Sequence, residues 1–389
     1  MRAWWEHDVG MTESGRMTPF TISTSAEQLA DLRVRLGRSL WPSALPATGW
    51  QYGADGEYLH DLARHWLDSF DWPQQERRLN QLPQFLLSVE GWTVHVIHVR
   101  GQGPDPLPII LTHGWPGLFW ELLPLVPLLT HPDDPRDAFD VVIPSLPGYG
   151  FSPPAAQPGL SPTPRLWAAI MRRLGYERFV AYGSDFGASV TTDLAGQFPD
   201  RVRAILLSTA SDIAWPAPLP DPATLTDDER RFLRAWDDWD RAEGGYRHEQ
   251  RTRPQTLAYG LTDSPLGLAA WIVEKLRAWS DCAGDIERRF SKDAVLTLVM
   301  LYWVTGCIAS SLREYYERFH APASPPRTIS VPTGVALFTR DFWMPRSWAE
   351  RTYAITRWTE FAQGGHFPAY EEPRLLAEEC RAFFRPFRA

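Results

Sequence analysis

The chain has 389 residues, of which 44% are hydrophobic and 22% charged, a composition typical of a globular protein with a large buried core. The formal net charge of −8 opposes binding to phosphate backbones, so we expect no nucleic-acid partner. No apolar run reaches the roughly 18 residues of a membrane span, and the N-terminus lacks a signal-peptide pattern, so we predict a cytoplasmic protein. The cysteines are too few and too scattered for a disulfide framework or a metal site, and we expect buried free thiols at Cys282, Cys307 and Cys380.

Helical patterns come first along the chain. Residues 1–17 show no periodicity and are predicted to form a tail. An amphipathic stretch begins after Ser23 or Ser25, either of which can cap a helix, and it stops at a pair of prolines. A second helical pattern covers residues 57–70. Residues 18–84 are therefore predicted to form a helical extension ahead of the sheet.

Short apolar strands separated by helices follow this extension. They are expected at residues 85–90, 92–100, 108–112, 139–145, 178–183, 203–208 and 333–338. This alternation indicates an α/β fold with a mostly parallel, doubly wound sheet. The long interval before the last of these strands has helical patterns and Pro-rich ends. We therefore predict two core segments, 85–213 and 327–389, with a helical cap inserted at 214–326.

The pentapeptide Gly-Ser-Asp-Phe-Gly at residues 183–187 lies where a strand runs into a helix, which is the context of a nucleophile elbow. The tight turn requires small residues two places before and after its centre, so Gly183 and Gly187 make Asp185 the central residue. If Ser184 were central, the flanking positions would hold large aromatic residues. Asp185 is then either a helix N-cap or a nucleophile that attacks an sp³ carbon and forms an alkyl ester. The second role suits epoxides and haloalkanes.

A histidine and a second acid would complete such a site, in the order nucleophile, acid, histidine. His366 lies in a Gly-Gly-His-Phe loop before the final helix and is the histidine in the required place. Asp341, just past the strand at 333–338, is expected to orient its imidazole. Asp212, which follows the strand at 203–208, is the alternative acid.

The loop His-Gly-Trp-Pro-Gly at residues 113–117 directly follows a predicted strand. Hydrolysis of an ester develops a negative oxygen that needs preorganised backbone donors. We expect the amides of Trp115 and Phe186 to form this oxyanion hole. His113 is expected to be a structural member of the loop.

These motifs, together with the segment at 144–152, resemble those of the α/β-hydrolase-fold epoxide hydrolases. Segments at 41–42, 50–53, 58–66, 70–72, 79–85 and 89–99 look like the N-terminal extension of the microsomal epoxide hydrolase branch. The resemblance covers nearly everything after Met17. It implies the α/β-hydrolase fold, with Asp185 as nucleophile, His366 as base and Asp341 as acid.

The same resemblance implies two cap tyrosines that assist ring opening, Tyr246 and Tyr315. Because Tyr316 is adjacent, an offset of one residue stays open, although a helix turns about 100° per residue and only one of the two can face the site. A phenol can donate a proton to the opening epoxide oxygen, which a haloalkane does not require. The sequence departs from the branch in residues around the elbow and in the acid motif, which affects the expected pocket shape more than the mechanism.

We therefore predict an epoxide hydrolase that needs no metal, nucleotide or redox cofactor, since no ligand cluster or phosphate loop appears. An apolar substrate is favoured by the Trp-rich cap, which contains Trp236, Trp239, Trp271, Trp279 and Trp303. A haloalkane dehalogenase-like enzyme, an epoxide-opening cyclase and a binding protein without turnover are the alternatives. The sequence leaves a homodimer open.

Overall fold

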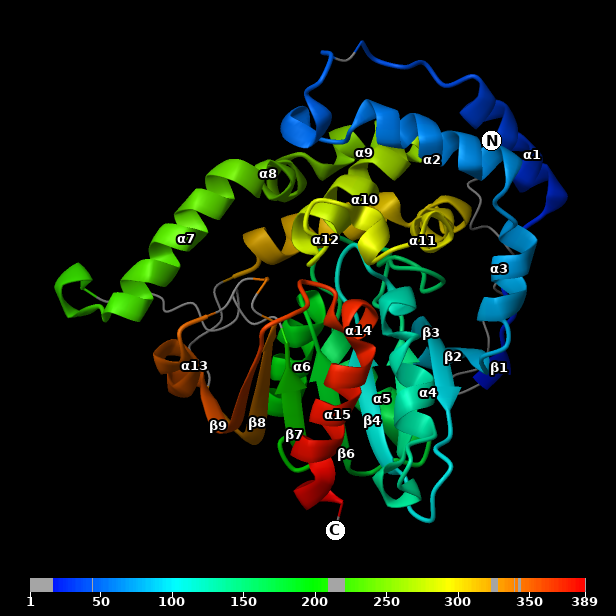
Figure 1. Ribbon diagram of the computed structural model, residues 1–389. Helices are drawn as coiled ribbons and strands as arrows, with labels where there is room; N and C mark the ends of the chain where they lie inside the picture. Colours follow the sequence, from blue (N-terminus) through cyan, green and yellow to red (C-terminus); the bar gives the residue numbers. More distant parts are fainter. Residues whose placement is uncertain are drawn as a thin grey trace.

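A single sheet of nine strands runs through the part of the chain that the structure describes (Figure 1). The computed structural model describes residues 17–43, 45–208, 221–322, 328–338, 340–341 and 344–388. In chain order the strands are β1 (Met17–Pro19), β2 (Gln84–Val89), β3 (Trp92–Val99), β4 (Leu107–Thr112), β5 (Phe139–Pro144), β6 (Phe179–Gly183), β7 (Val202–Leu207), β8 (Ile329–Phe338) and β9 (Tyr353–Phe361). Across the sheet they lie in the order β1-β2-β3-β5-β4-β6-β7-β8-β9.

Strand direction divides the sheet into two parts. β1, β2, β3 and β5 pair antiparallel, whereas β5, β4, β6, β7, β8 and β9 pair in parallel. Ile109 of β4 pairs with Val141 of β5 and with Val180 of β6. All residues of β5 and β6 are buried, as expected for parallel strands that are covered on both faces. The mostly parallel sheet predicted from the sequence is confirmed.

Two edge strands were not predicted. β1 includes Met17, which was predicted to belong to a tail, and its other two residues lie in the segment that was predicted to be helical. β1 pairs with β2. β9 pairs in parallel with β8 and is only partly buried along its length. A short strand and a half-exposed edge strand both lack the continuous apolar run that marks a central strand, which explains why the pattern missed them.

The core helices pack on the sheet in pairs (Figure 1). Helix α5 packs with α6, and α4 packs with α15. The bounds of the core helices are α4 (Leu125–Thr130), α5 (Thr163–Arg173), α6 (Phe186–Gln197), α13 (Arg346–Thr352), α14 (Pro368–Glu371) and α15 (Pro373–Phe384). Short 3₁₀ turns occur at η1 (Gly49–Tyr52), η2 (Phe119–Leu122), η3 (Pro135–Asp137), η4 (Pro222–Thr224), η5 (Ile286–Arg288) and η6 (Arg385–Phe387). The loops at the carboxyl ends of the parallel strands therefore stay uncovered by core helices and face the cap.

Six cap helices lie above these loops (Figure 1). They are α7 (Asp227–Glu243), α8 (Gly245–Thr252), α9 (Pro254–Asp263), α10 (Pro265–Trp279), α11 (Lys292–Thr305) and α12 (Ile308–His320). Helix α11 ends because Gly306 adopts a left-handed conformation with φ of +65°, and α12 continues at an angle of 86°. Parts of the Pro-rich ends of the predicted cap, at 214–220 and 323–326, lie outside the described residues.

The N-terminal extension contains α1 (Ala26–Gly37), α2 (Gly56–Asp68) and α3 (Trp72–Leu79). Helix α1 begins after Ser25, whose side chain accepts the Gln28 amide in a capping box, which decides between the two predicted serine caps. Helices α1 and α2 pack against α10, and α2 and α3 pack against α11. The extension therefore supports the cap on the side away from the sheet (Figure 1).

Among the described residues, two ion pairs and one histidine–carboxylate hydrogen bond fasten the extension to the cap. Their donor and acceptor atoms are 2.7 Å apart in Arg35–Asp263, 2.7 Å in His65–Asp293 and 2.8 Å in Lys292–Asp61. We call these three pairs the extension tether. Each pair includes a partly exposed side chain, so its individual contribution to stability is small.

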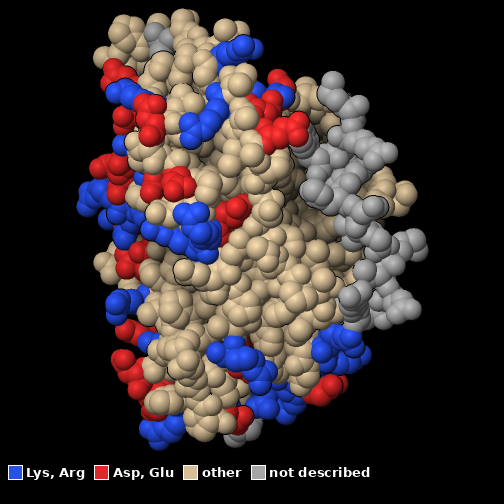
Figure 2. Space-filling model, turned by 90° about the vertical axis from the view of Figure 1, so that its right-hand side faces the viewer, with Lys and Arg blue, Asp and Glu red and all other residues tan. Residues whose placement is uncertain are grey.

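The surface carries both signs of charge. On the face shown in Figure 2, lysine and arginine residues are interspersed with aspartate and glutamate, and the middle of the face is largely uncharged. This face therefore presents no extended basic area to which a phosphate backbone would bind. The three cysteines are free and buried, as predicted.

Candidate active site

Two loops emerge side by side from the centre of the sheet, because Thr112 at the end of β4 pairs with Gly183 at the end of β6. Asp185 follows β6 with φ of +52° and ψ of −129°, a strained conformation for a residue with a side chain. It occupies the N-cap position of α6, yet its side chain makes no capping hydrogen bond. Instead, the Trp115 amide donates to Asp185 Oδ1 across 2.9 Å. The carboxylate therefore faces the neighbouring loop and not the helix that it precedes.

Glycines make this close approach of the two loops possible. A Cβ on Gly183 would collide with the carbonyl oxygen of Gly187, and a Cβ on Gly187 would collide with that of Thr112. A Cβ on Gly114 would collide with the Asp185 side chain. The elbow thus requires the small residues that its register predicted.

Gly183→Ala is expected to lower the free energy of unfolding by about 1–3 kcal/mol, because the added methyl has no space in a well-packed turn. Gly260→Ala is the matched control, since Gly260 lies within α9 and nothing lies within 4 Å of its added Cβ. There the same change should be neutral or slightly stabilising. Denaturant unfolding of both variants measures the difference, and equal losses would contradict this account of the elbow.

His366 lies beside Asp185 on the loop that follows β9. Its Nε2 is 3.6 Å from Asp185 Oδ2, an ion-pair distance that is too long for a hydrogen bond. Its Nδ1 is 3.2 Å from Asp341 Oδ1, to which it can donate. Its own amide donates to the Trp279 carbonyl across 2.9 Å, which fixes the loop against the cap.

The charge on His366 is set by two opposing effects. Burial disfavours the imidazolium, but the carboxylates of Asp341 and Asp185 outweigh it and raise the pKa of His366 well above its ordinary value. The resting site therefore favours an imidazolium between two carboxylates. Asp341 lies three residues past the end of β8, where its amide donates to the Phe338 carbonyl. The alternative acid, Asp212, lies outside the described residues.

Two cap tyrosines meet above the elbow. The Tyr315 ring centroid is 4.7 Å from that of Phe186 and 5.9 Å from that of Tyr246. Both tyrosines also pack on Trp115, with centroid distances of 5.5 Å for Tyr246 and 5.7 Å for Tyr315. Tyr316, by contrast, is 37% exposed and stacks on His320 at 4.0 Å. Of the two adjacent tyrosines, Tyr315 is thus the one that faces the site.

The phenol of Tyr315 stays protonated under ordinary conditions. Burial is the main cause that raises its pKa well above the usual value, and Tyr246 and Asp185 raise it further. A neutral phenol can donate a hydrogen bond or a proton. The cap therefore places a protonated phenol beside Phe186, the residue that follows Asp185.

Known proteins are similar to this chain in both sequence and architecture. A sequence profile described as "Epoxide hydrolase N terminus" matches residues 17–122, and one described as "alpha/beta hydrolase fold" matches residues 107–256. Epoxide hydrolase 1 of Sus scrofa is 34% identical, over 95% of this chain and 89% of that protein. The chain belongs to the epoxide hydrolase family.

Solved structures of epoxide hydrolases have the same architecture. The structure of the Aspergillus niger epoxide hydrolase superposes with a TM-score of 0.84 at 32% identity, covering 95% of this chain and 96% of that one. The juvenile hormone epoxide hydrolase of Bombyx mori gives a TM-score of 0.85 at 29% identity, covering 96% of this chain and 95% of that one. The α/β-hydrolase fold predicted from the sequence is confirmed.

The oxyanion donors predicted for this family member come from both loops. The Trp115 amide is already bound to Asp185 Oδ1. Phe186 is the first residue of α6, where amides have no partner within the helix. His113 is fully buried, and its Nε2 accepts the Leu146 amide across 3.1 Å while its Nδ1 faces the Gly114 carbonyl. Burial lowers the pKa of His113 to about 4, so it is a neutral brace of the loop.

The tryptophans of the cap lie in different environments. Trp279 packs on His366 with centroids 5.0 Å apart and on Tyr246 at 4.9 Å. Trp239 lies 6.5 Å from Tyr246 and 5.5 Å from Trp236. Trp279 and Trp239 thus pack on Tyr246, and Trp236 packs on Trp239. Trp271 instead donates to Gln250, and Trp303 lines a separate cavity.

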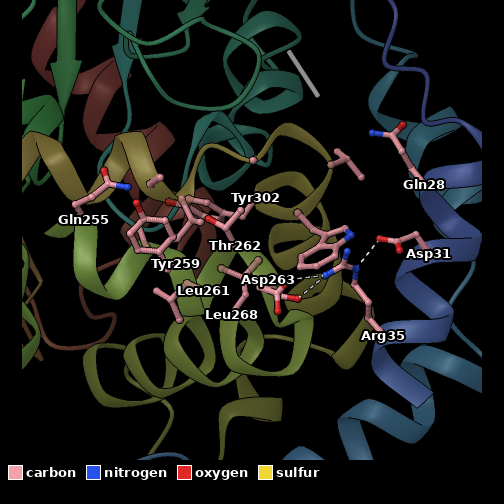
Figure 3. Close-up of a pocket in the computed structure, with 16 residues that line it drawn as sticks. Gln28, Asp31, Arg35, Gln255, Tyr259, Leu261, Thr262, Asp263, Leu268 and Tyr302 are labelled. Carbon is pink, nitrogen blue, oxygen red and sulfur yellow. Dashed lines mark hydrogen bonds and ion pairs between the residues drawn. The ribbon is translucent and has the colours of Figure 1, made fainter. Parts of the chain in front are cut away.

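This separate cavity, of about 450 Å³, lies between α1 and the cap helices α9 to α12 (Figure 3). Figure 3 shows Arg35 reaching from α1 to Asp263, the pair that belongs to the extension tether. Of the described residues that line it, none is a predicted catalytic residue. It is therefore distinct from the site above Asp185.

Within the described residues, no single helix is long and apolar enough to span a membrane. Helices α11 and α12 reach that length and apolarity only together, as a pair bent by 86°. No group of three or more His, Cys, Asp and Glu side chains in the same part of the chain has the arrangement of a metal site.

One ionisable residue near the elbow was missed by the sequence predictions. Glu121 lies on η2 and is buried, and burial raises its pKa to about 8. The available signal was an isolated acidic residue within the apolar run Leu-Phe-Trp-Glu-Leu-Leu. A lone charge in such a run points to a buried carboxyl with a specific partner.

Proposed function

We propose that the protein converts an apolar epoxide to a vicinal diol through a covalent ester on Asp185. The observation that carries this proposal is the arrangement of the two carboxylate oxygens. Oδ1 accepts the Trp115 amide, whereas Oδ2 faces His366 at 3.6 Å. One oxygen is held by a backbone donor, and the other lies on the side of the base.

In the first step, Asp185 Oδ2 attacks an epoxide carbon. A new bond forms between Oδ2 and this carbon, and the bond from the carbon to the epoxide oxygen breaks. The electron pair stays on that oxygen, to which Tyr246 or Tyr315 donates a proton. The contact between the two tyrosines supports a shared role, because each phenol can stabilise the phenolate that forms on the other.

In the second step, His366 removes a proton from water, and the resulting hydroxide attacks Cγ of the ester. Formation of the ester removes the negative charge of Asp185, which is one of the causes that raise the pKa of His366. The imidazolium therefore becomes easier to deprotonate once the ester has formed. Its proton passes to the phenolate left by the first step, which restores the tyrosine and gives the neutral imidazole that acts on water. The amides of Trp115 and Phe186 stabilise the oxyanion on Cγ. When this intermediate collapses, the bond from Cγ to the alkyl oxygen breaks, and that oxygen takes the proton of the added hydroxyl group, which releases the diol and restores the Asp185 carboxylate.

The proposed substrate is apolar because aromatic rings border the space above Asp185. Trp115, Phe186 and Trp279 contribute to this border together with the two tyrosines. Such surfaces favour carbon substituents over charged ones. We expect styrene-type or terpene-type epoxides to be turned over better than epoxides of polar sugars.

A single turnover in ¹⁸O-labelled water tests the covalent step. Water attacks Cγ of the ester, so one labelled oxygen should remain in the Asp185 carboxylate, and the first diol should carry none. Mass spectrometry of the peptide that contains Asp185 measures this label. A labelled first diol with an unlabelled peptide would mean that water attacks the epoxide directly. An identical incubation without substrate serves as the control for background exchange.

A further inference from the structure

Glu121 is built into the loop that carries the predicted oxyanion donor. Its Oε1 accepts the Gly114 amide across 3.1 Å, and its own amide donates to the Gly117 carbonyl across 3.2 Å. The side chain is only 4% exposed. The buried carboxyl group of Glu121 thus binds the backbone at the start of this loop.

The loop is shaped around this carboxyl. A Cβ on Gly117 would collide with the Glu121 carboxyl group. The preceding residue, Trp120, is held in place by stacking on Tyr370 with centroids 4.4 Å apart. Burying a carboxyl without a compensating partner is costly, so a niche of this kind points to a specific task.

The hydrogen bond of Glu121 lies one residue away from the contact with the nucleophile. Gly114 presses against Asp185, where a Cβ would collide, and the following amide, of Trp115, donates to Asp185 Oδ1. The Gly114 amide therefore anchors the residue whose φ and ψ angles set the direction of the Trp115 amide. Loss of this anchor would let the peptide rotate away from Asp185.

We propose that Glu121 is a positioning residue, which holds the backbone of Gly114 so that the following amide, of Trp115, points at Asp185 and at the oxyanion that forms there. This inference rests on the proposed function, because the oxyanion exists only if the ester is formed. Glu121 touches neither substrate nor water in this role. It acts through the backbone donor.

The charge state of the carboxyl fits this task. Burial is the main cause that raises the pKa of Glu121 to about 8; the Gly114 hydrogen bond and His366 lower it, while Asp185 raises it. At neutral pH the group is therefore mostly uncharged and adds no negative charge beside the oxyanion. Tyr182 and Tyr302, which also face Glu121, have raised pKa values and stay neutral in this range.

Two variants of the full chain test the proposal. Glu121→Gln keeps an acceptor for the Gly114 amide, whereas Glu121→Met keeps the length of the side chain and removes the acceptor. Single turnovers with racemic styrene oxide, quenched and followed by mass spectrometry of the protein, give the rates of ester formation and ester hydrolysis. At pH 7 we expect Glu121→Gln to hydrolyse the ester within about threefold of the wild type, and Glu121→Met about 100-fold more slowly.

The pH profile separates this role from simple support of the fold. Ionisation of Glu121 places a negative charge beside the oxyanion, so the wild-type hydrolysis rate should fall by up to tenfold per unit above about pH 8. Glu121→Gln should lack this fall. Deprotonation of His366 has the opposite effect on the hydrolysis rate. Hydrolysis needs the neutral imidazole, so this titration raises the rate as the pH rises.

Wild-type hydrolysis by Glu121→Met, or a fall above pH 8 that persists in Glu121→Gln, would overturn the proposal. If circular dichroism shows that Glu121→Met does not fold, the pH profile of ester hydrolysis by Glu121→Gln is the deciding measurement. A wild-type protein that forms no ester on Asp185 would refute the proposed function, an outcome that is visible before the variants are compared.

Discussion

His366→Gln is expected to stop the reaction at the ester. The glutamine side chain can still form a hydrogen bond, but it cannot take a proton from water, so kcat should fall by about 10³-fold or more. Ester formation does not need the base, because the Asp185 carboxyl group itself attacks the epoxide and Trp115 holds its Oδ1. The protein should therefore gain the mass of one substrate molecule per chain, and this adduct should persist.

Intact-protein mass spectrometry after mixing with styrene oxide measures the adduct, and peptide mapping assigns it to Asp185. His131→Gln is the matched control, since His131 is an exposed residue outside the site and the change should leave turnover intact. If His366→Gln showed normal turnover, another group would be the base. If it formed no adduct at all, the division into two steps would be wrong.

The double variant Tyr246→Phe with Tyr315→Phe is expected to lose the first step. Without either phenol, the oxygen of the opening ring receives no proton, and ester formation should slow by about 10²–10⁴-fold. The rings keep their packing on Trp115, so the fold should be little affected. Each single variant should retain more activity, because the remaining phenol can still donate.

Single-turnover rates of ester formation with styrene oxide and with a haloalkane measure this effect. A halide leaves without protonation, so a dehalogenase-like enzyme would keep its haloalkane activity in the double variant. Tyr316→Phe is the matched control, because Tyr316 is the adjacent tyrosine and stacks on His320 away from the site. Wild-type opening of epoxides by the double variant would remove the tyrosines from the mechanism.

Much of the fold followed from the sequence because central parallel strands are continuous apolar runs. β4 to β8 were predicted for this reason, and the two glycines of the elbow placed Asp185. The edge strands β1 and β9 were missed, since their pairing depends on backbone hydrogen bonds with neighbours and not on their own apolar content. The break between α11 and α12 depends on one left-handed glycine.

The site was less accessible to sequence reasoning. The order nucleophile, acid, histidine along the chain pointed to Asp341 and His366. The distances between these side chains and Asp185 depend on loops whose conformation no local pattern specifies. The choice of Tyr315 over Tyr316 depends on the exact rotation of α12, which follows from the angle at which that helix leaves α11. Glu121 was missed because its role comes from a hydrogen bond to the backbone of a loop seven residues earlier.

The extension tether has a consequence for how ligands enter and leave. A cap that swung away as a hinged lid would have to break all three contacts of the tether at once and separate α1 and α2 from α10. Cooperative rupture of this kind is far slower than the rotation of a few side chains. We therefore expect exchange of epoxide and diol to proceed by local rearrangement around a stationary cap, so that the width of the passage selects among substrates.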